Sequence, residues 1–441
     1  MPGPPRVVGI VAGGGSLPRE VAEYVRASGG AVHIVSIIGE GDLDLSGFPL
    51  TKVGWAQTGG MLRALRNANV TELVIVGAVR RPDLSAIKPD IGFFLNLPAI
   101  ARIVATTGDD GVLTGVVRFF ESKGFKVVSP AQVAPSILVD EGPLGALAAG
   151  PHDMIDIARG FDVIRALGPF DVGQAVVVAG GQIEAIEGAE NTDAMLARLA
   201  LQRRAGDGAI GPRRGVLIKR PKPGQEMRVD MPAIGPRTVS RAVEAGLSGV
   251  AVLAGGAIAL ERAELIANAD RQGLFVIGAA EPGSAQAAPL ATKAAPEIVP
   301  EIALPFTTVG TVHPGPRQIA DAFRGAAVLA ALKPFCTSGG VVIDRGHILG
   351  IESGEGVAAL IARAGGLRQW GRRRWARRSI IAVVSQTLSA DIVSVIASGA
   401  AAHMAGIAVV GCSEGDLAHG IETAERYRMF LMAVQREGSS T

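Results

Sequence analysis

An internal repeat is the feature that most restricts the fold of this chain. Residues 159–187 recur in divergent form as residues 324–352, at one fixed offset. The matched positions include turn residues as well as apolar ones: Arg159-Gly160 with Arg324-Gly325, Pro169-Phe170 with Pro334-Phe335, and Ile186-Glu187 with Ile351-Glu352. Shared composition does not reproduce turn residues at a constant spacing. The two segments are therefore predicted to fold alike.

Strand and helix patterns alternate along the first 135 residues, which is typical of a doubly wound parallel sheet. The buried strand at Val7–Ala12 opens this pattern. We predict an α/β protein of four parts: a Rossmann-like domain at 1–135, a second α/β domain at 136–280, a linker rich in Pro and Ala at 281–316, and a divergent repeat of the second domain at 317–441.

Composition excludes several classes of protein. A net charge of +2 and an aromatic content of 4% argue against nucleic-acid binding. Two cysteines without Cys/His ligand spacing fit a reducing compartment and argue against a zinc site. Residues 392–413 lack charged side chains, but they read as a helix, a turn and a strand rather than as a membrane span. Without a secretory signal pattern, we expect a cytoplasmic protein.

A charged segment, Lys219–Gly235, interrupts this apolar sequence. Three prolines and two glycines prevent it from forming a regular helix. The corresponding residues of the second repeat, 382–391, lack most of these charges although the core positions are kept. The charges are therefore predicted to serve chemistry rather than folding, while a different surface on the second repeat is the alternative.

A glycine turn, Gly13-Gly14-Gly15, follows the first strand and opens a helix that Ser16 is expected to cap. Backbone N–H groups at such a turn can approach a phosphate. The dinucleotide fingerprint is incomplete because Pro18 stands where its last small residue should be. Phosphate binding and a plain tight turn both remain open from the sequence.

Two further motifs carry polar groups with two interpretations each. Thr192 and Asp193 begin a helical run, where they either cap the helix or contact a substrate. Their counterparts in the second repeat are Val357 and Ala358, which favours the substrate interpretation. Arg81 and Asp83 follow a strand end, which suits either a ligand cleft or a surface turn.

Taken together, these motifs resemble the LpxI family of UDP-2,3-diacylglucosamine pyrophosphatases. The residues that carry the resemblance lie in family order within 6–280: Gly9 to Pro18, Arg81-Pro82-Asp83, Gly108-Asp109-Asp110, Thr192 to Leu196, and Pro221 to Gly235. The resemblance implies hydrolysis of a UDP-diacylglucosamine to UMP and 2,3-diacylglucosamine 1-phosphate in lipid A biosynthesis, with a divalent cation such as Mg²⁺. Family members usually end near residue 280, so the second repeat is predicted to be non-catalytic.

The resemblance marks Asp230 as the critical acid, and we expect it to hold the metal and its water. Diphosphate hydrolysis also requires charge neutralisation, which predicts further roles in the charged segment. The expected catalytic residues are Asp230, Glu226, Arg228 and Lys222. The expected substrate-binding residues are Gly13, Gly14, Gly15, Arg81, Asp83, Thr192, Asp193, Lys219 and Gln225.

The lipid substrate implies peripheral contact with the inner membrane, and a homodimer remains open. Two other classes of function compete with this hypothesis. One is a nucleotide-binding regulator or nicotinamide oxidoreductase on the same sheet, against which the incomplete glycine fingerprint counts. The other is a scaffold without activity, which the divergent second repeat suggests.

Overall fold

The computed structural model describes ten stretches of the chain, and its contacts divide the chain into two compact units. Unit 1 comprises residues 1–140, 225–237 and 254–268, and unit 2 comprises residues 141–224, 238–253 and 269–441. The described residues are 6–40, 44–79, 88–105, 109–207, 212–281, 306–335, 339–367, 379–385, 392–412 and 414–435.

Unit 1 is built on a parallel sheet of five strands in the order β3-β2-β1-β4-β5. The strands are β1 (Val7–Ala12), β2 (Ala31–Ile37), β3 (Leu50–Val53), β4 (Glu72–Val76) and β5 (Lys126–Val127). This order reverses direction at β1, as in a doubly wound fold. The predicted Rossmann-like N-terminal domain is therefore confirmed.

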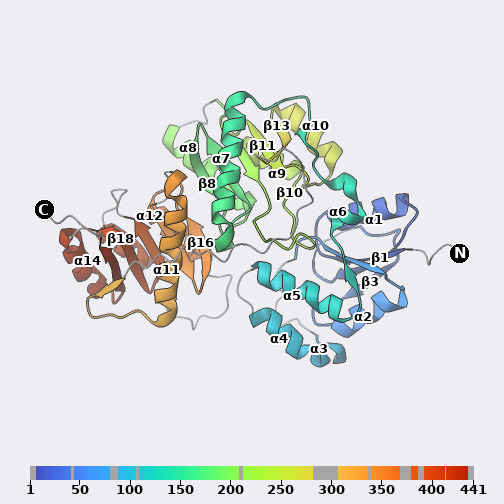
Figure 1. Ribbon diagram of the computed structural model, residues 1–441, viewed down its shortest axis with the longest axis horizontal. Helices are drawn as coiled ribbons and strands as arrows, with labels where there is room; N and C mark the ends of the chain where they lie inside the picture. Colours follow the sequence, from blue (N-terminus) through green and yellow to red (C-terminus); the bar gives the residue numbers. More distant parts are fainter. Residues whose placement is uncertain are drawn as a thin grey trace. The chain divides into compact units, whose positions relative to one another are not determined.

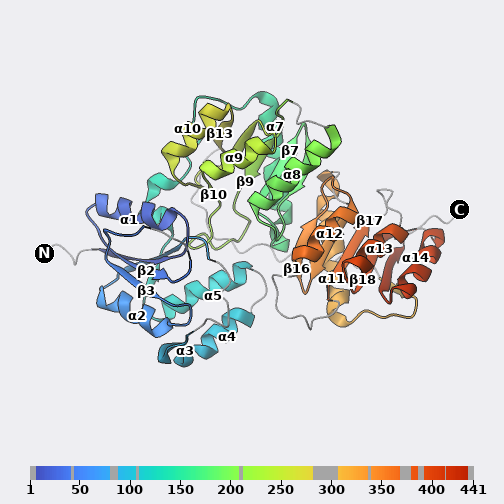
Figure 2. The same cartoon turned by 180° about the vertical axis from the view of Figure 1, so that it is seen from behind.

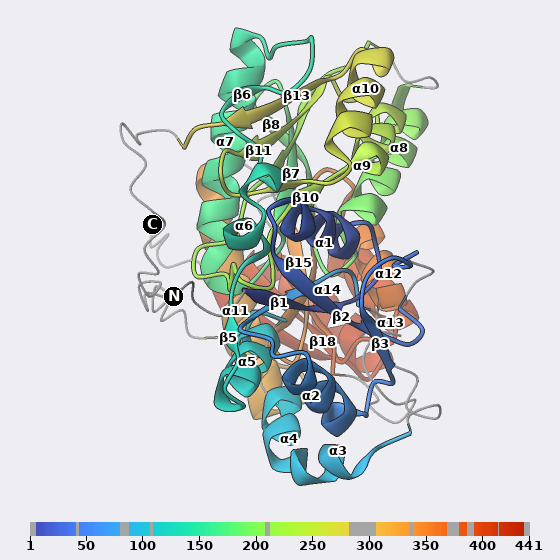
Figure 3. The ribbon, with the colours of Figure 1, turned by 90° about the vertical axis from the view of Figure 1, so that its right-hand side faces the viewer.

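Helices cover both faces of the unit 1 sheet, because successive strand residues point to opposite sides. Ile10 faces α1 (Leu17–Ala27) and α6 (Pro130–Val133), whereas Val11 faces α2 (Thr58–Asn67) and α5 (Asp109–Ser122). Figure 3 shows α1 and α2 on opposite sides of the strands. The remaining elements are α3 (Ile91–Leu95), α4 (Leu97–Ala105), η1 (Pro135–Ile137), and the strand pair β10 (Ala233–Ile234) and β12 (Ile258–Ala259).

Unit 2 begins with a mixed sheet in the order β6-β13-β11-β9-β7-β8. Its strands are β6 (Gly142–Pro143), β7 (Ala175–Ala179), β8 (Gln182–Ile186), β9 (Val216–Lys219), β11 (Gly249–Leu253) and β13 (Phe275–Ala279). The helices of this part of the chain are α7 (Pro151–Leu167), η2 (Gly168–Phe170), α8 (Thr192–Asp207), α9 (Pro236–Glu244) and α10 (Arg262–Gln272). Helices α9 and α10 begin in unit 1 and end in unit 2. Strands β9, β11 and β13 run parallel, and β7 and β8 form the predicted hairpin.

A second sheet in unit 2 has the same plan, with the order β14-β19-β18-β17-β15-β16 and the same sequence of parallel and antiparallel pairs. Its elements are β14 (Thr307–Val309), α11 (Pro316–Leu332), η3 (Lys333–Phe335), β15 (Gly340–Asp344), β16 (His347–Ile351), α12 (Val357–Leu367), β17 (Ile381–Ser385), α13 (Ile392–Ala401), β18 (Gly406–Cys412), α14 (Glu414–Arg426) and β19 (Phe430–Gln435). Helix α11 lies in front of this sheet in Figure 1, whereas α12 and α13 lie in front of it in Figure 2.

One hydrophobic core joins the two sheets of unit 2. Helices α7 and α11 pack against each other, and their buried faces belong to the same cluster as strands β7, β9, β15 and β17. A separate cluster fills the space between the second sheet and helices α12, α13 and α14. Each repeat therefore has helices on both faces of its sheet, and the two repeats share the α7 and α11 side.

Several expectations about local structure need correction. The Ser16 side chain makes no capping hydrogen bond to α1, and its buried hydroxyl has no hydrogen-bond partner among the described residues. The expected linker at 281–316 contains β14, because this strand pairs with β19. Strand β3 was not anticipated, since Leu50–Val53 is short and half polar.

The interpretation of residues 392–413 as a helix, a turn and a strand is confirmed by α13 and β18. Across the residues that the structure describes, no helix combines the length and the apolar character needed to cross a bilayer.

Candidate active site

The charged segment is divided between the two units. Residues 219–224 belong to unit 2, and residues 225–237 belong to unit 1. Strand β9 delivers the segment at Lys219, after which two prolines and Gly224, at φ +83°, keep it irregular. Each part is anchored differently within its own unit.

In unit 2, the three cationic side chains of this segment are buried. Lys219, Arg220 and Lys222 are each less than 9% exposed. Arg220 pairs with Glu281 at 2.8 Å and lies over the Phe161 ring, 5.7 Å from its centroid. Lys222 pairs with Asp171. Burial of cations is costly unless acids compensate them, so these charges are held by specific partners rather than by solvent.

Gly168 shows how closely the segment packs in unit 2. A Cβ atom at Gly168 would lie 2.6 Å from Cδ of Pro223. The equivalent position in the second repeat is Lys333, and the sequence there has no counterpart of Pro223. Gly168 therefore leaves room for the charged segment. The second repeat lacks that segment, and a lysine can stand at the equivalent position.

In unit 1, apolar side chains on either side of Asp230 fasten the segment. Val229 packs against the core on the α2 side of the sheet, and Met231 packs against the core on the α1 side. Strand β10 then pairs with β12. Asp230 therefore lies where the chain passes from one face of the sheet to the other, in a fixed and half-buried position.

Gln225 positions the Asp230 carboxylate. Its Nε2 donates to Oδ2 of Asp230 at 2.5 Å and to the Asp230 carbonyl at 3.0 Å. The Asp230 N–H donates to the Glu226 carbonyl at 3.0 Å, which closes a turn. A buried amide that holds both the backbone and the carboxylate of one acid restricts the directions in which that acid can act. The structure thus brings together two of the predicted site residues.

Glu226 and Arg228 form a second pair beside that turn. Arg228 donates from Nε and Nη2 to the two Glu226 oxygens, each at 2.7 Å, and from Nη1 to Glu121 at 2.7 Å. Hydrogen bonding from Arg228 holds the pKa of Glu226 below its ordinary value, against burial, which raises it. The same pairing raises the pKa of Arg228. This arrangement makes Glu226 a partner that orients Arg228.

The Glu226 pairing predicts a dependence of stability on pH. Because the folded-state pKa of Glu226 lies below the ordinary 4.5, its contribution is fully present above that value and is lost as pH falls through the folded pKa. We expect Glu226→Gln to be less stable than the parent chain at neutral pH, with the difference disappearing in acid. Urea unfolding of both chains at several pH values measures this. A difference that grows on acidification would contradict the assignment.

The glycine turn has a structural role in unit 1. The N–H groups of Gly13 and Gly14 donate to the carbonyls of Val76 and Ala78, at 2.8 and 2.7 Å. A Cβ at Gly13 would lie 2.5 Å from the Ala78 carbonyl oxygen, and one at Gly14 would lie 2.6 Å from that of Glu40. These backbone contacts alone require glycine at both positions, whether or not a ligand binds there. Substrate binding at Gly13, Gly14 and Gly15 remains a prediction.

Thr192 also has a partner within unit 2. Its hydroxyl donates to the buried Glu187 at 2.7 Å, while the Asn191 side chain caps α8 by accepting from the Ala194 N–H at 3.1 Å. In the second repeat, the N–H groups of Gly354 and Gly356 bind the equivalent Glu352 instead. The loss of the threonine there has a structural explanation, so substrate binding by Thr192 and Asp193 remains a prediction. Arg81 and Asp83 lie outside the described residues.

The residues around Asp230 fit Mg²⁺ bound by one carboxylate rather than by a cluster of protein ligands. Among the described residues, there is no cluster of three or more acidic, histidine or cysteine side chains of the kind that encloses a metal. Mg²⁺ commonly binds through one or two carboxylates together with substrate phosphates. A single oriented carboxylate such as Asp230 fits that manner of binding, whereas Glu226 is engaged by Arg228.

Two family models match the part of the chain that contains the charged segment and the N-terminal sheet. The LpxI N-terminal domain model matches residues 7–137, and the LpxI C-terminal domain model matches residues 140–277. The chain belongs to the LpxI family. It is 40% identical over 273 residues to UDP-2,3-diacylglucosamine pyrophosphatase LpxI of Caulobacter vibrioides, and this alignment covers 62% of the chain and 97% of the relative.

Membership of the LpxI family confirms the predicted resemblance and the prediction that the chain is an enzyme of the hydrolase class. Neither family match extends past residue 277.

The sequence did not reveal the acids that hold the cations of the segment. Asp171 and Glu281 are distant in sequence from Lys222 and Arg220, the cations that they bind. One signal was available for Asp171, since it directly follows the repeated Pro169-Phe170 turn, where its φ of +55° suits an aspartate. No local pattern distinguishes Glu281 from other acids near the end of a strand.

Proposed function

We propose that this protein hydrolyses the diphosphate of UDP-2,3-diacylglucosamine, giving UMP and 2,3-diacylglucosamine 1-phosphate for lipid A biosynthesis. The observation that carries the proposal is the alignment with a relative named for this activity, which covers 97% of that relative. The two family matches cover residues 7–137 and 140–277 and therefore include both parts of the charged segment. We place the reaction in the cytoplasm, beside the inner membrane that holds the lipid product.

Diphosphate hydrolysis forms one P–O bond to water and breaks one bridging P–O bond. The water must lose a proton, and negative charge grows on the departing phosphate. We assign Asp230 to position the water and receive its proton, because Gln225 fixes its carboxylate. Arg228, oriented by Glu226, is the matching donor to a phosphate oxygen.

We also propose that Mg²⁺ is required, held by Asp230 together with phosphate oxygens of the substrate. When bound, the ion supplies charge neutralisation at the diphosphate. The single oriented carboxylate supports this proposal, since it leaves the remaining ligands to substrate and water. Chelation should abolish turnover and leave the urea midpoint of the substrate-free protein unchanged.

The direct test incubates the full chain with UDP-2,3-diacylglucosamine in detergent micelles, with and without Mg²⁺. We expect UMP and the diacylglucosamine 1-phosphate in equal amounts, detected by chromatography and mass spectrometry. Reaction in ¹⁸O-labelled water would show which product receives the new oxygen, and hence which phosphorus is attacked. A chain that binds the substrate and releases no UMP would support the scaffold interpretation instead.

An exposed apolar patch in unit 1 supports peripheral contact with the membrane. Ile91, Phe94, Leu95 and Leu97, on α3 and the start of α4, are between 45% and 80% exposed. Four such side chains within seven residues are unusual on a protein surface. The proposed substrate is a lipid, so the protein must reach the bilayer surface. We therefore propose that this patch inserts among the lipid head groups.

Removal of this patch should weaken membrane binding. Ile91 and Leu95 lie one helical turn apart, so Ile91→Ser with Leu95→Ser removes neighbouring side chains. We expect partitioning onto phosphatidylethanolamine–phosphatidylglycerol vesicles to fall about tenfold or more, on the scale of burying two apolar side chains. Leu201→Ser, at the 66% exposed Leu201 of α8, is the control. Equal partitioning of all three chains in a flotation assay would refute the proposal.

A further inference from the structure

The two repeats of unit 2 share individual contacts as well as strand order. Asp156 accepts hydrogen bonds from the N–H groups of Gly180 and Gly181 in the β7–β8 turn. Asp321, 165 positions later, accepts the same two bonds from the β15–β16 turn. The hairpins also carry a register shift at the same place, after Val177 in one and after Val342 in the other. Bulges at equivalent positions are features of one shared fold.

The contacts between the repeats are reciprocal. Arg159 of α7 donates to the Phe335 carbonyl at 3.0 Å, and Arg324 of α11 donates to the Phe170 carbonyl at 2.8 Å. Each guanidinium also lies over the ring of the same phenylalanine, 5.7 and 6.0 Å from the centroids. The arginine of each repeat thus contacts the phenylalanine of the other repeat in the same way.

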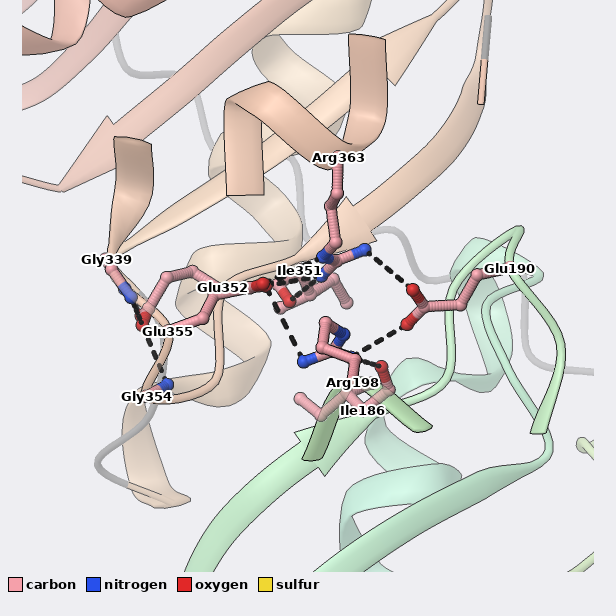
Figure 4. A network of polar contacts seen from close by, with 10 residues as sticks. Ile186, Glu190, Arg198, Gly339, Ile351, Glu352, Gly354, Glu355 and Arg363 are labelled. Carbon is pink, nitrogen blue, oxygen red and sulfur yellow. Dashed lines mark hydrogen bonds and ion pairs between the residues drawn. The ribbon is translucent and has the colours of Figure 1, made fainter. Parts of the chain in front are cut away.

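Four charged residues form a closed ring across the same interface (Figure 4). Within each repeat, Arg198 pairs with Glu190 at 2.7 Å, and Arg363 pairs with Glu355 at 2.6 Å. Between the repeats, Arg198 approaches Glu355 at 3.7 Å, and Arg363 approaches Glu190 at 3.5 Å. All four side chains are at most 15% exposed. Each buried charge therefore has one opposite charge in its own repeat and a second one in the other repeat.

The interface is not exactly symmetric among the described residues. The Ala189 N–H donates to the Leu349 carbonyl of the second repeat at 3.2 Å, whereas Gly354, at the position equivalent to Ala189, donates to Glu352 of its own repeat at 2.7 Å. Elsewhere, α7 and α11 pack directly against each other within one continuous core. A divergent contact beside reciprocal ones indicates two copies that have drifted apart.

We propose that residues 306–435 are a second copy of the first repeat and act as its built-in partner. Reciprocal contacts of this kind characterise a two-fold interface between identical subunits. An arbitrary pair of domains would instead meet through unlike surfaces. The face formed by α7, η2 and the start of α8 therefore recognises a domain of its own kind. In this chain the partner is covalently attached, so the full protein does not need a second chain on this face.

The first test separates the covalent link from the interface. A specific protease site placed within residues 282–305 allows the purified full chain to be cut. We expect the two pieces to elute as one particle. Glu190→Arg with Arg198→Glu keeps the pair within the first repeat but opposes like charges across the interface. This change should weaken association by about 100-fold or more, the scale of breaking buried ion pairs.

Rescue makes this test specific to the reciprocal ring. Adding Glu355→Arg and Arg363→Glu should restore association, because every cross-repeat pair again joins opposite charges. Arg241→Glu, a charge reversal on the surface of α9, is the control and should leave association unchanged. Circular dichroism confirms that each piece is folded. Pieces that separate without any substitution, or a fourfold variant that fails to reassociate, would overturn the proposal.

The second test uses the chain ending at Glu281. A relative of this extent exists, since the alignment covers 97% of it and only 62% of this chain. With the second repeat removed, we expect the shortened chain to dimerise through the exposed face, and Arg198→Glu to make it monomeric. The full chain should have the mass of one chain in light scattering. A folded shortened chain that stays monomeric at about 100 µM would show that this face does not recognise its own kind.

Discussion

Asp230→Ala is expected to lower kcat for UMP release by about 10³-fold, the range for losing a positioned acid–base or charge-stabilising group. Gln225 orients the Asp230 side chain. The backbone beside Asp230 is held by the packing of the Val229 side chain, which does not involve the Asp230 carboxylate. Folding should therefore be nearly unchanged. Initial rates with UDP-2,3-diacylglucosamine and the urea midpoint of the same preparation measure the two effects separately.

Two further variants sharpen the Asp230 prediction. Gln225→Ala should reduce kcat by about tenfold with little change in KM, because it frees the direction of the carboxylate without removing it. Asp140→Ala, at an acid of unit 1 that is 85% exposed, is the control and should retain full activity. If Asp230→Ala kept the activity of the control, both the catalytic role and the metal-binding role of Asp230 would be wrong.

Arg203→Leu is expected to lower the stability of unit 2 by about 3–5 kcal/mol, the cost of breaking a buried charged network by removing one member. Arg203 is 8% exposed and donates to Glu184 at 2.5 Å. It also donates to the carbonyls of Ala245, Gly246 and Arg214. Its removal leaves an acid and three carbonyl groups without this donor.

A chain of several units need not unfold in one step, so hydrogen exchange at the amides of α8 and β9 is the suitable measurement for Arg203→Leu. Arg204→Ala changes the adjacent exposed arginine of the same helix and should have no measurable effect. Similar exchange rates in the two variants would show that the Arg203 contacts contribute little stability.

The parts of the fold that depend on local pattern could be predicted from the sequence. Strand β1 has the predicted limits, Val7–Ala12, because a continuous apolar run ends there at a glycine turn. Strand β3 could not be predicted, since Leu50–Val53 alternates weakly and becomes a strand through pairing with β2. The Ser16 cap failed for a related reason, as the backbone of Ser16 is already helical.

The candidate site could be located from the sequence but not assembled from it. The prolines and charges of the segment drew attention to Asp230 and Gln225, and these two side chains do meet. Whether a buried cation is a ligand group or a structural one depends on partners distant in sequence, such as Asp171 for Lys222. The loss of Thr192 from the second repeat suggested chemistry, although two backbone N–H groups replace its hydroxyl there.

The division of the chain has a consequence for its biosynthesis. Unit 1 is discontinuous, and its last stretch ends at residue 268. A ribosome that has released residues 1–140 has therefore supplied the parallel sheet but neither Asp230 nor the β10–β12 pair. The N-terminal unit must wait for much of its neighbour to emerge before its final residues can dock. During that interval the nascent chain exposes the surfaces on which Val229 and Met231 later pack, and these are natural sites for a chaperone to bind.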